Sequence, residues 1–119
     1  MIVSKKVSFD AAHFLPGYIG KCANMHGHHW VVELGVEGEV NPETGMVIDF
    51  SRLKEFWEDN FQEAFDHKLL NDTISNPTAE NIALYIREAC GWLEAANLKL
   101  AFIRVWETPD SFAEVKGDG

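Results

Sequence analysis

The sequence contains few cysteines, few basic residues and no long apolar run. Two cysteines among 119 residues are too few for the disulfide framework of a small secreted domain. No segment approaches the roughly 18 consecutive apolar residues of a membrane helix, so we expect no membrane insertion. Ten Lys and Arg residues against nineteen Asp and Glu residues give a net charge of −9, which repels polyanions at long range. We therefore expect no nucleic-acid partner.

Repeats, low-complexity tracts and Pro/Gly/Ser-rich linkers are also absent from the sequence. We therefore expect one domain across residues 1–119, a length sufficient for a single hydrophobic core. The N-terminal residues place lysines within an alternating apolar pattern and show no secretory core followed by a small-residue cleavage site. We expect the protein to stay in the cytoplasm.

Strand-like patterns at the two ends of the chain flank two helical patterns. Residues 2–9 have the composition of a strand, and residues 28–40 alternate between an apolar and an acidic face. The apolar face contains Trp30, Val32, Leu34 and Val36. Turn residues at 41–45 predict that residues 46–48 return as an antiparallel hairpin partner.

The two helical patterns have apolar side chains at steps of three and four residues. Asp49 is predicted to cap the first helix. Its apolar positions are Phe50, Leu53, Trp57, Phe61, Ala64 and Phe65. Pro77 is predicted at the first position of the second helix, where its missing N–H does no harm. The apolar stripe of that helix is Ala79, Ile82, Ala83, Ile86, Ala89, Cys90 and Leu93.

Two further strands, at residues 99–107 and 111–115, complete the element order ββααββ. This order predicts an α+β fold in which both helices cover one face of an antiparallel four-stranded sheet. Residues 100–106 are mainly apolar on both alternating faces. We therefore expect the second face of the sheet to be buried against other subunits of a homo-oligomer.

The segment KCANMHGHHW, residues 21–30, gathers one of the two cysteines and three of the five histidines. His26 and His28 fall on the same face of a strand, whereas His29 points away and has no assigned role. Together with His13, these two residues predict a three-histidine zinc site with an open fourth position, the arrangement of catalytic zinc. Iron, cobalt and nickel are also compatible with imidazole ligands. The alternative is a set of unconnected polar histidines at a strand end.

Cys22 leaves two interpretations of this metal site open. It precedes His26 by four residues, so it could complete a closed set of one cysteine and three histidines around a structural zinc. Alternatively, Cys22 lies near the metal without binding it. Its thiolate, stabilised by the neighbouring cation or histidine, then acts as a base or nucleophile.

Four other residues carry hypotheses of their own. Asp66 and His67 would form a proton relay if the fold brings them to Cys22, and are otherwise a solvated loop pair. Glu107 ends an apolar strand, where it is either solvated or placed to bind a guanidine-like edge with two adjacent donors. Cys90 lies on the apolar stripe of the second helix and is interpreted as a small buried hydrophobe.

Six short motifs, in order, resemble the 6-pyruvoyltetrahydropterin synthase family over roughly residues 7–108. They are FDAAHFL at 9–15, CANMHGH at 22–28, TGMVIDF at 44–50, DHKLLN at 66–71, NPTAENIA at 76–83 and WET at 106–108. Within the family, three residues between the cysteine and HGH resemble the 6-carboxytetrahydropterin synthase branch of queuosine biosynthesis. The 6-pyruvoyl enzymes usually have a wider spacing, and a folate-related branch has glutamate at the position of Cys22.

The resemblance implies a zinc enzyme that converts 7,8-dihydroneopterin triphosphate to 6-carboxy-5,6,7,8-tetrahydropterin, with loss of triphosphate and acetaldehyde. It implies the following roles: His13, His26 and His28 as zinc ligands, Cys22 as catalytic base, Asp66 and His67 as its relay partners, and Glu107 as the anchor of the amino-pyrimidine edge of the pterin. Lys21, beside the cysteine, is the candidate for the triphosphate.

The family resemblance also implies the tunnelling fold, in which the sheets of several subunits join into a barrel with active sites at subunit interfaces, typically in a hexamer. Two alternatives remain. One is the 6-pyruvoyl product, formed by elimination of triphosphate. The other is a zinc-stabilised module that binds a pterin without chemistry.

Overall fold

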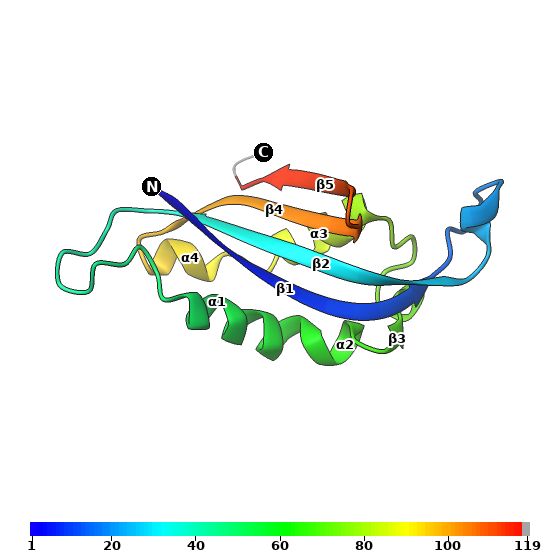
Figure 1. Ribbon diagram of the computed structural model, residues 1–119, viewed down its shortest axis with the longest axis horizontal. Helices are drawn as coiled ribbons and strands as arrows, with labels where there is room; N and C mark the ends of the chain where they lie inside the picture. Colours follow the sequence, from blue (N-terminus) through cyan, green and yellow to red (C-terminus); the bar gives the residue numbers. More distant parts are fainter. Residues whose placement is uncertain (118–119) are drawn as a thin grey trace.

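The computed structural model describes residues 1–117, apart from the side chain of Cys22. Five strands form one sheet in the order β3-β1-β2-β4-β5, and the helices lie against one of its faces (Figure 1). The strands are β1 (Ile2–His13), β2 (His26–Glu37), β3 (Lys68–Leu69), β4 (Lys99–Thr108) and β5 (Ser111–Lys116). The helices are α1 (Phe50–Trp57), α2 (Glu63–Phe65), α3 (Ala79–Arg87) and α4 (Trp92–Ala95). A π-helical segment (Glu58–Gln62) joins α1 to α2, and 3-10 turns lie at Lys21–Ala23 and Leu70–Asp72.

The α+β class is confirmed, but the expectation of a four-stranded antiparallel sheet is wrong. The short strand β3 pairs with β1 in parallel, with Ala11 opposite Lys68 and Ala12 opposite Leu69, so the sheet is mixed. After α2 the chain turns at His67, whose φ of 58° lies in the left-handed region, and its N–H donates to the Asp10 carbonyl at 2.6 Å. Two residues are too few to produce an alternating pattern, so the sequence gives no sign of this strand.

The predicted hairpin of residues 46–48 is also wrong. This segment is not a strand; the Asn41 N–H donates to the Met46 carbonyl at 2.9 Å and closes a loop. The partner of β2 is β1, paired along twelve residues from Ile2–Glu37 to His13–His26, with β4 on its other side. β1 therefore runs four residues past its predicted end, and His13 is its last residue instead of following it.

The helices begin close to their predicted positions. Asp49 caps α1, because its carboxylate accepts from the Ser51 N–H at 2.9 Å. The start of α3 differs from the prediction: Thr78 is the cap, and its hydroxyl accepts from the Asn81 N–H at 3.0 Å. Pro77 thus precedes the helix instead of opening it, and its carbonyl becomes available to another partner. Phe50 and Ala64, predicted on the apolar face of the first helix, are exposed.

The core lies between the helices and the sheet. All four predicted apolar residues of β2 are at most 1% exposed. Phe9 of β1 packs among three aromatic rings, those of Trp30, Trp57 and Phe65. The stripe of the second helical segment also faces this core through Ile82, Ala83, Ile86, Cys90 and Leu93. The same core fixes β1 and β2 side by side, which positions the histidines at their ends.

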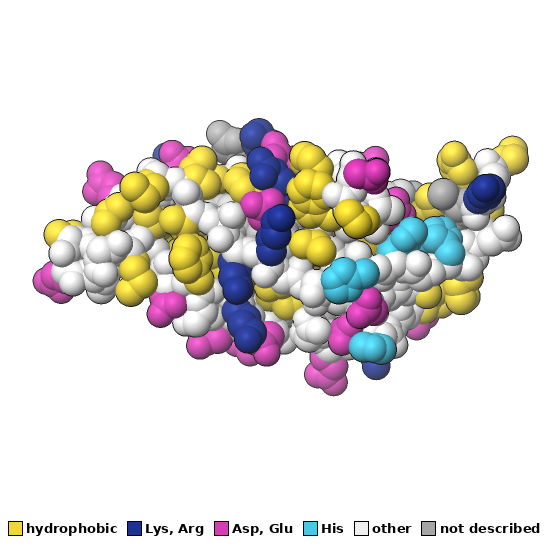
Figure 2. All heavy atoms as spheres, viewed as in Figure 1, with side chains coloured by type: hydrophobic (Ala, Val, Ile, Leu, Met, Phe, Trp, Pro, Cys, Tyr) yellow, Lys and Arg dark blue, Asp and Glu magenta, His cyan; other side chains and the backbone are white. Residues whose placement is uncertain are grey.

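No helix within residues 1–117 covers the opposite face of the sheet. Arg104 of β4 pairs there with Glu33 at 3.2 Å and with Glu114 at 2.7 Å. Trp106 packs against Phe112 of β5, with ring centroids 4.4 Å apart. Figure 2 shows Lys and Arg side chains crossing the molecule between hydrophobic patches. None of the described helices is long and apolar enough to cross a membrane.

Candidate metal centre

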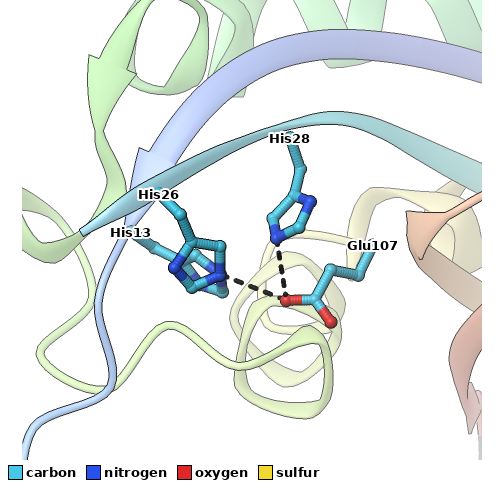
Figure 3. Close-up of side chains that lie close together, drawn as sticks. All are labelled: His13, His26, His28 and Glu107. Carbon is cyan, nitrogen blue, oxygen red and sulfur yellow. Dashed lines mark hydrogen bonds and ion pairs between the residues drawn. The ribbon is translucent and has the colours of Figure 1, made fainter. Parts of the chain in front are cut away.

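Three histidines meet at one end of the β1–β2 pair. His13 and His26 are opposite each other in the antiparallel register, so their side chains share a face, and their ring centroids are 4.6 Å apart. His28 follows two residues later on the same face of β2, and its ring centroid lies 4.7 Å from that of His26. The structure therefore brings together the three histidines that the sequence nominated as metal ligands (Figure 3).

Glu107 completes the cluster from β4. Its Oε1 atom lies 3.1 Å from His13 Nε2 and 3.5 Å from His28 Nε2, while His13 Nε2 and His26 Nε2 are 3.1 Å apart. One ligand atom from each of the four residues lies within 4.8 Å of the others, so the cluster could hold a metal ion. The family resemblance assigns Glu107 to the amino-pyrimidine edge of a pterin, and its position beside the histidines was not predicted. Its alternation with Ile103 and Val105, both fully buried, was the available signal, because it assigns Glu107 to the helix-covered face.

Two backbone carbonyls set the orientation of the histidine rings. His13 Nδ1 donates to the Pro77 carbonyl and His26 Nδ1 to the Asn24 carbonyl, each at 2.7 Å. A carbonyl can only accept, so both Nδ1 atoms carry the proton and both Nε2 atoms present lone pairs to the cluster. Metal-binding histidines usually have this second-partner arrangement.

His28 has the features of a metal ligand. Its Nε2 atom is buried and has no hydrogen-bond partner among the described residues. Burial lowers the pKa of His28 below its ordinary value, and His26 and His13 lower it further, whereas Glu107 raises it. The lowered pKa favours the neutral ring, which is the form that binds metals. A divalent cation fits this cluster, since it would satisfy the orphaned nitrogen and remove the repulsion between facing lone pairs.

A pocket of about 490 Å³ borders the cluster. His28 and Glu107 line it together with Trp106, Lys6 and His29. This volume lies within the range of small-molecule sites, and its walls combine apolar surface with a few polar groups, as is typical of such sites.

Asp66 and His67 form a hydrogen-bonded pair. Asp66 Oδ2 lies 3.0 Å from His67 Nδ1, and Asp66 Oδ1 accepts from the Asp10 N–H at 3.0 Å. That backbone bond is the main cause of a lowered pKa of the Asp66 carboxyl; burial raises this pKa, and the hydrogen bond with His67 lowers it further. The side chain of His67 is 78% exposed. His29, unassigned from the sequence, lies beside this pair and contacts Asp10 at 2.9 Å.

The remaining candidates are the two cysteines and Lys21. Cys22 belongs to the 3-10 turn Lys21–Ala23, but its side chain lies outside the described part of the chain, so its roles remain predictions. Lys21 is exposed. Cys90 is buried, its Sγ contacts the Ile86 carbonyl at 3.5 Å, and burial raises its thiol pKa to about 11. The interpretation of Cys90 as a core residue is confirmed.

The fold and the site together define an α+β protein with a candidate metal centre at one end of a mixed sheet. The sequence profile described as 6-pyruvoyl tetrahydropterin synthase matches residues 2–118, so the chain belongs to this family of pterin-biosynthetic enzymes. The family resemblance of the six motifs is thereby confirmed.

Three known proteins illustrate the relationship. A protein of Archaeoglobus fulgidus, named provisionally as a 6-carboxy-5,6,7,8-tetrahydropterin synthase, is 41% identical over 116 residues, which cover 98% of this chain and 96% of the relative. The dihydroneopterin monophosphate aldolase of Pyrococcus furiosus is 39% identical over 102 residues, covering 86% and 85%. The structure of Caenorhabditis elegans 6-pyruvoyl tetrahydropterin synthase superposes with a TM-score of 0.84 at 28% identity, covering 98% of this chain and 95% of that one.

Proposed function

We propose that this protein is a zinc-dependent lyase that converts 7,8-dihydroneopterin triphosphate to 6-carboxy-5,6,7,8-tetrahydropterin, with loss of triphosphate and acetaldehyde, in queuosine biosynthesis. The observation that carries the proposal is the convergence of three histidines and a carboxylate beside a pocket of about 490 Å³. The spacing of three residues between Cys22 and His26 supports the carboxy product.

His13, His26 and His28 would hold the zinc through their Nε2 atoms. Imidazole nitrogen is a preferred zinc donor, and the outer carbonyls of Pro77 and Asn24 already hold two of the rings in the required tautomer. When bound, zinc supplies Lewis-acid polarisation of hydroxyl groups at neutral pH.

Protons would be moved by Cys22 as base and by His67 and Asp66 as its relay. The Asp66 carboxylate orients His67 through the contact at 3.0 Å and stabilises the imidazolium that forms when His67 takes up a proton. The high exposure of His67 in one chain leaves it available to a neighbouring chain. We propose that residues 1–119 form one domain, that six copies assemble, and that active sites form at subunit interfaces.

Glu107 would bind the amino-pyrimidine edge of the pterin, because a carboxylate can accept two parallel N–H bonds from adjacent donors. Lys21 would contact the triphosphate. The chain has only ten Lys and Arg residues, so few cations are available for this role, and Lys21 lies beside Cys22.

A second candidate function is the aldolase reaction on dihydroneopterin monophosphate. It is favoured by the 39% identity with the Pyrococcus furiosus enzyme of that name. The residue at position 22 is a difference from one branch of the family: a folate-related branch has glutamate where this chain has Cys22. The two candidates differ in the phosphate chain of the substrate and in the product.

One product analysis tests both candidates. The zinc-loaded protein is incubated separately with 7,8-dihydroneopterin triphosphate and with the monophosphate, and the pterins are separated by chromatography. We expect 6-carboxytetrahydropterin and acetaldehyde from the triphosphate, and negligible turnover of the monophosphate.

Other products would redirect the assignment. A 6-pyruvoyl product would retain the family and reject the branch, and turnover of the monophosphate alone would support the aldolase. Saturable binding of the triphosphate without any product would reject the enzyme in favour of a pterin-binding module.

A further inference from the structure

The carboxylate of Glu107 lies at the spacing of a fourth zinc ligand. Tetrahedral zinc with bonds of about 2.0 to 2.1 Å has ligand atoms about 3.3 to 3.5 Å apart. Glu107 Oε1 is 3.1 Å from His13 Nε2 and 3.5 Å from His28 Nε2, and the two nearest histidine nitrogens are 3.1 Å apart. The carboxylate is therefore as close to the histidines as they are to one another.

The surroundings of His13 suit a cation shared with Glu107. His13 is fully buried, and its Nδ1 proton is donated to the Pro77 carbonyl. In the neutral ring the single lone pair of its Nε2 atom faces both Glu107 Oε1 and His26 Nε2. Three acceptor atoms at such distances repel one another unless a cation lies among them. Glu107, with a side chain 32% exposed, has solvent available and yet directs Oε1 inward (Figure 3).

We infer that Glu107 is a ligand of the metal in the substrate-free protein and that recognition of the pterin edge withdraws it. The inference rests on the proposed function, which gives Glu107 a pterin partner. A fork-like pair with two adjacent N–H groups uses both carboxylate oxygens. In the inferred arrangement the metal and the fork use the same lone pair of Oε1, so the two partners compete for Glu107.

Glu107 has space to move between these two positions. It borders the pocket of about 490 Å³ on one side and a hollow of about 150 Å³, lined also by Ala79 and Ser111, on the other. A rotation of its side chain would leave the β4 backbone in place. The fourth coordination position of the metal would then open only when a molecule with the correct edge is bound. Substrate selection would thus be linked to assembly of the reactive centre.

Cobalt substitution tests the inference without turnover. The wild type, Glu107→Gln and Glu107→Asp are loaded with Co²⁺, and the visible absorption is recorded with and without pterin, which has the edge but no phosphate chain. Glu80→Gln is the control, because Glu80 lines the small hollow beside Glu107 and the substitution removes the same charge. We expect pterin to shift the spectrum of the wild type and of Glu80→Gln toward that of Glu107→Gln.

Zinc affinity provides a second readout. Competition with a chelator should show an affinity at least about tenfold lower for Glu107→Gln, since removal of even outer-sphere partners costs about 10- to 100-fold. Glu107→Asp, which is one methylene shorter, should also lose affinity, and Glu80→Gln should stay within about twofold of wild type.

Three outcomes would overturn the inference. They are an unchanged zinc affinity in Glu107→Gln, a wild-type cobalt spectrum that pterin does not alter, and a pterin-induced shift that persists in Glu107→Gln because pterin itself binds the metal. The first two would leave the proposed reaction standing if product forms. A shift that depends on Glu107 in a protein without turnover would support the ligand exchange and reject the reaction.

Discussion

At the scale of single residues, the protonation of the histidine rings decides what the cluster can bind. Pro77 and Asn24 take the Nδ1 protons of His13 and His26, and this directs two lone pairs toward one point. Burial lowers the pKa of His28 and so favours its neutral ring. The cluster is thus prepared for a cation by backbone carbonyls that no side-chain substitution removes.

Cys22→Ala separates a catalytic thiol from a metal ligand. We expect this variant to retain about one zinc per chain, because three histidines suffice to hold the ion. Turnover should fall about 10²- to 10⁴-fold, the usual contribution of a general base. Metal analysis of the purified protein and the product assay measure the two quantities.

The matched control is Cys90→Ala, which removes the thiol that lies in the core. It should lose some stability and retain both zinc and turnover. Release of zinc and unfolding in Cys22→Ala would establish the closed structural site instead.

Cys90 should be inert toward thiol reagents in the folded protein. Its pKa is raised from 9.0 to about 11, so at pH 8 its thiolate fraction is roughly a hundredfold below that of an unperturbed cysteine. A disulfide reagent applied to Cys22→Ala should label no thiol in buffer and one thiol in denaturant. Rapid labelling in buffer would show that Cys90 is accessible.

At the scale of elements, the start of α3 links helix capping to the metal centre. Thr78 caps the helix, and the preceding residue, Pro77, accepts from His13 at 2.7 Å. The helix start therefore holds the carbonyl that orients the buried ring of His13. Neither contact is visible from the helical period of residues 79–93, which only locates the apolar stripe.

Thr78→Ala should lower the free energy of unfolding by about 1 kcal/mol, the usual cost of losing a threonine cap. Thr73→Ala, at an exposed threonine that caps no N-terminus, is the control and should change it by less than about 0.5 kcal/mol. Urea unfolding of the zinc-free proteins gives both values. Equal effects in the two variants would mean that the Thr78 cap contributes nothing specific.

At the scale of the whole molecule, the candidate metal centre lies at one end of the core, where Trp30 contacts the rings of His13 and His28, but the core residues themselves supply none of its candidate ligands. The core is formed by the inner face of the sheet and the helices, whereas the cluster lies at the end of β1 and the start of β2. We therefore expect a fold with such a core to form without zinc. Zinc should stabilise it only by binding the native state.

Removal of zinc tests this expectation. We expect chelation to leave the far-ultraviolet circular dichroism unchanged at 25 °C and to lower the melting temperature. At free zinc a thousandfold above its dissociation constant, the loss in unfolding free energy should be about 4 kcal/mol. An unfolded zinc-free protein would contradict the prediction and indicate a structural metal.

Much of the fold was predictable because its determinants are local. Alternation identified the inner face of β2, the three- and four-residue period located both helical segments, and Asp49 marked the first helix start. The motif spacing likewise nominated His13, His26 and His28, since a strand places residues two apart on one face. The six motifs in order also identified the family, and the match of the family profile to residues 2–118 confirms it.

The remainder depended on contacts between distant segments. Asp66 lies 56 residues from Asp10 and Pro77 lies 64 residues from His13, and no local period encodes either contact. The parallel pairing of β3, the choice of β1 as partner of β2 and the position of Glu107 all follow from the register of strands around one core. The sequence by itself nominated three histidines as candidate metal ligands. Only the tertiary structure placed a carboxylate among them, because strand register is set by packing across the whole sheet.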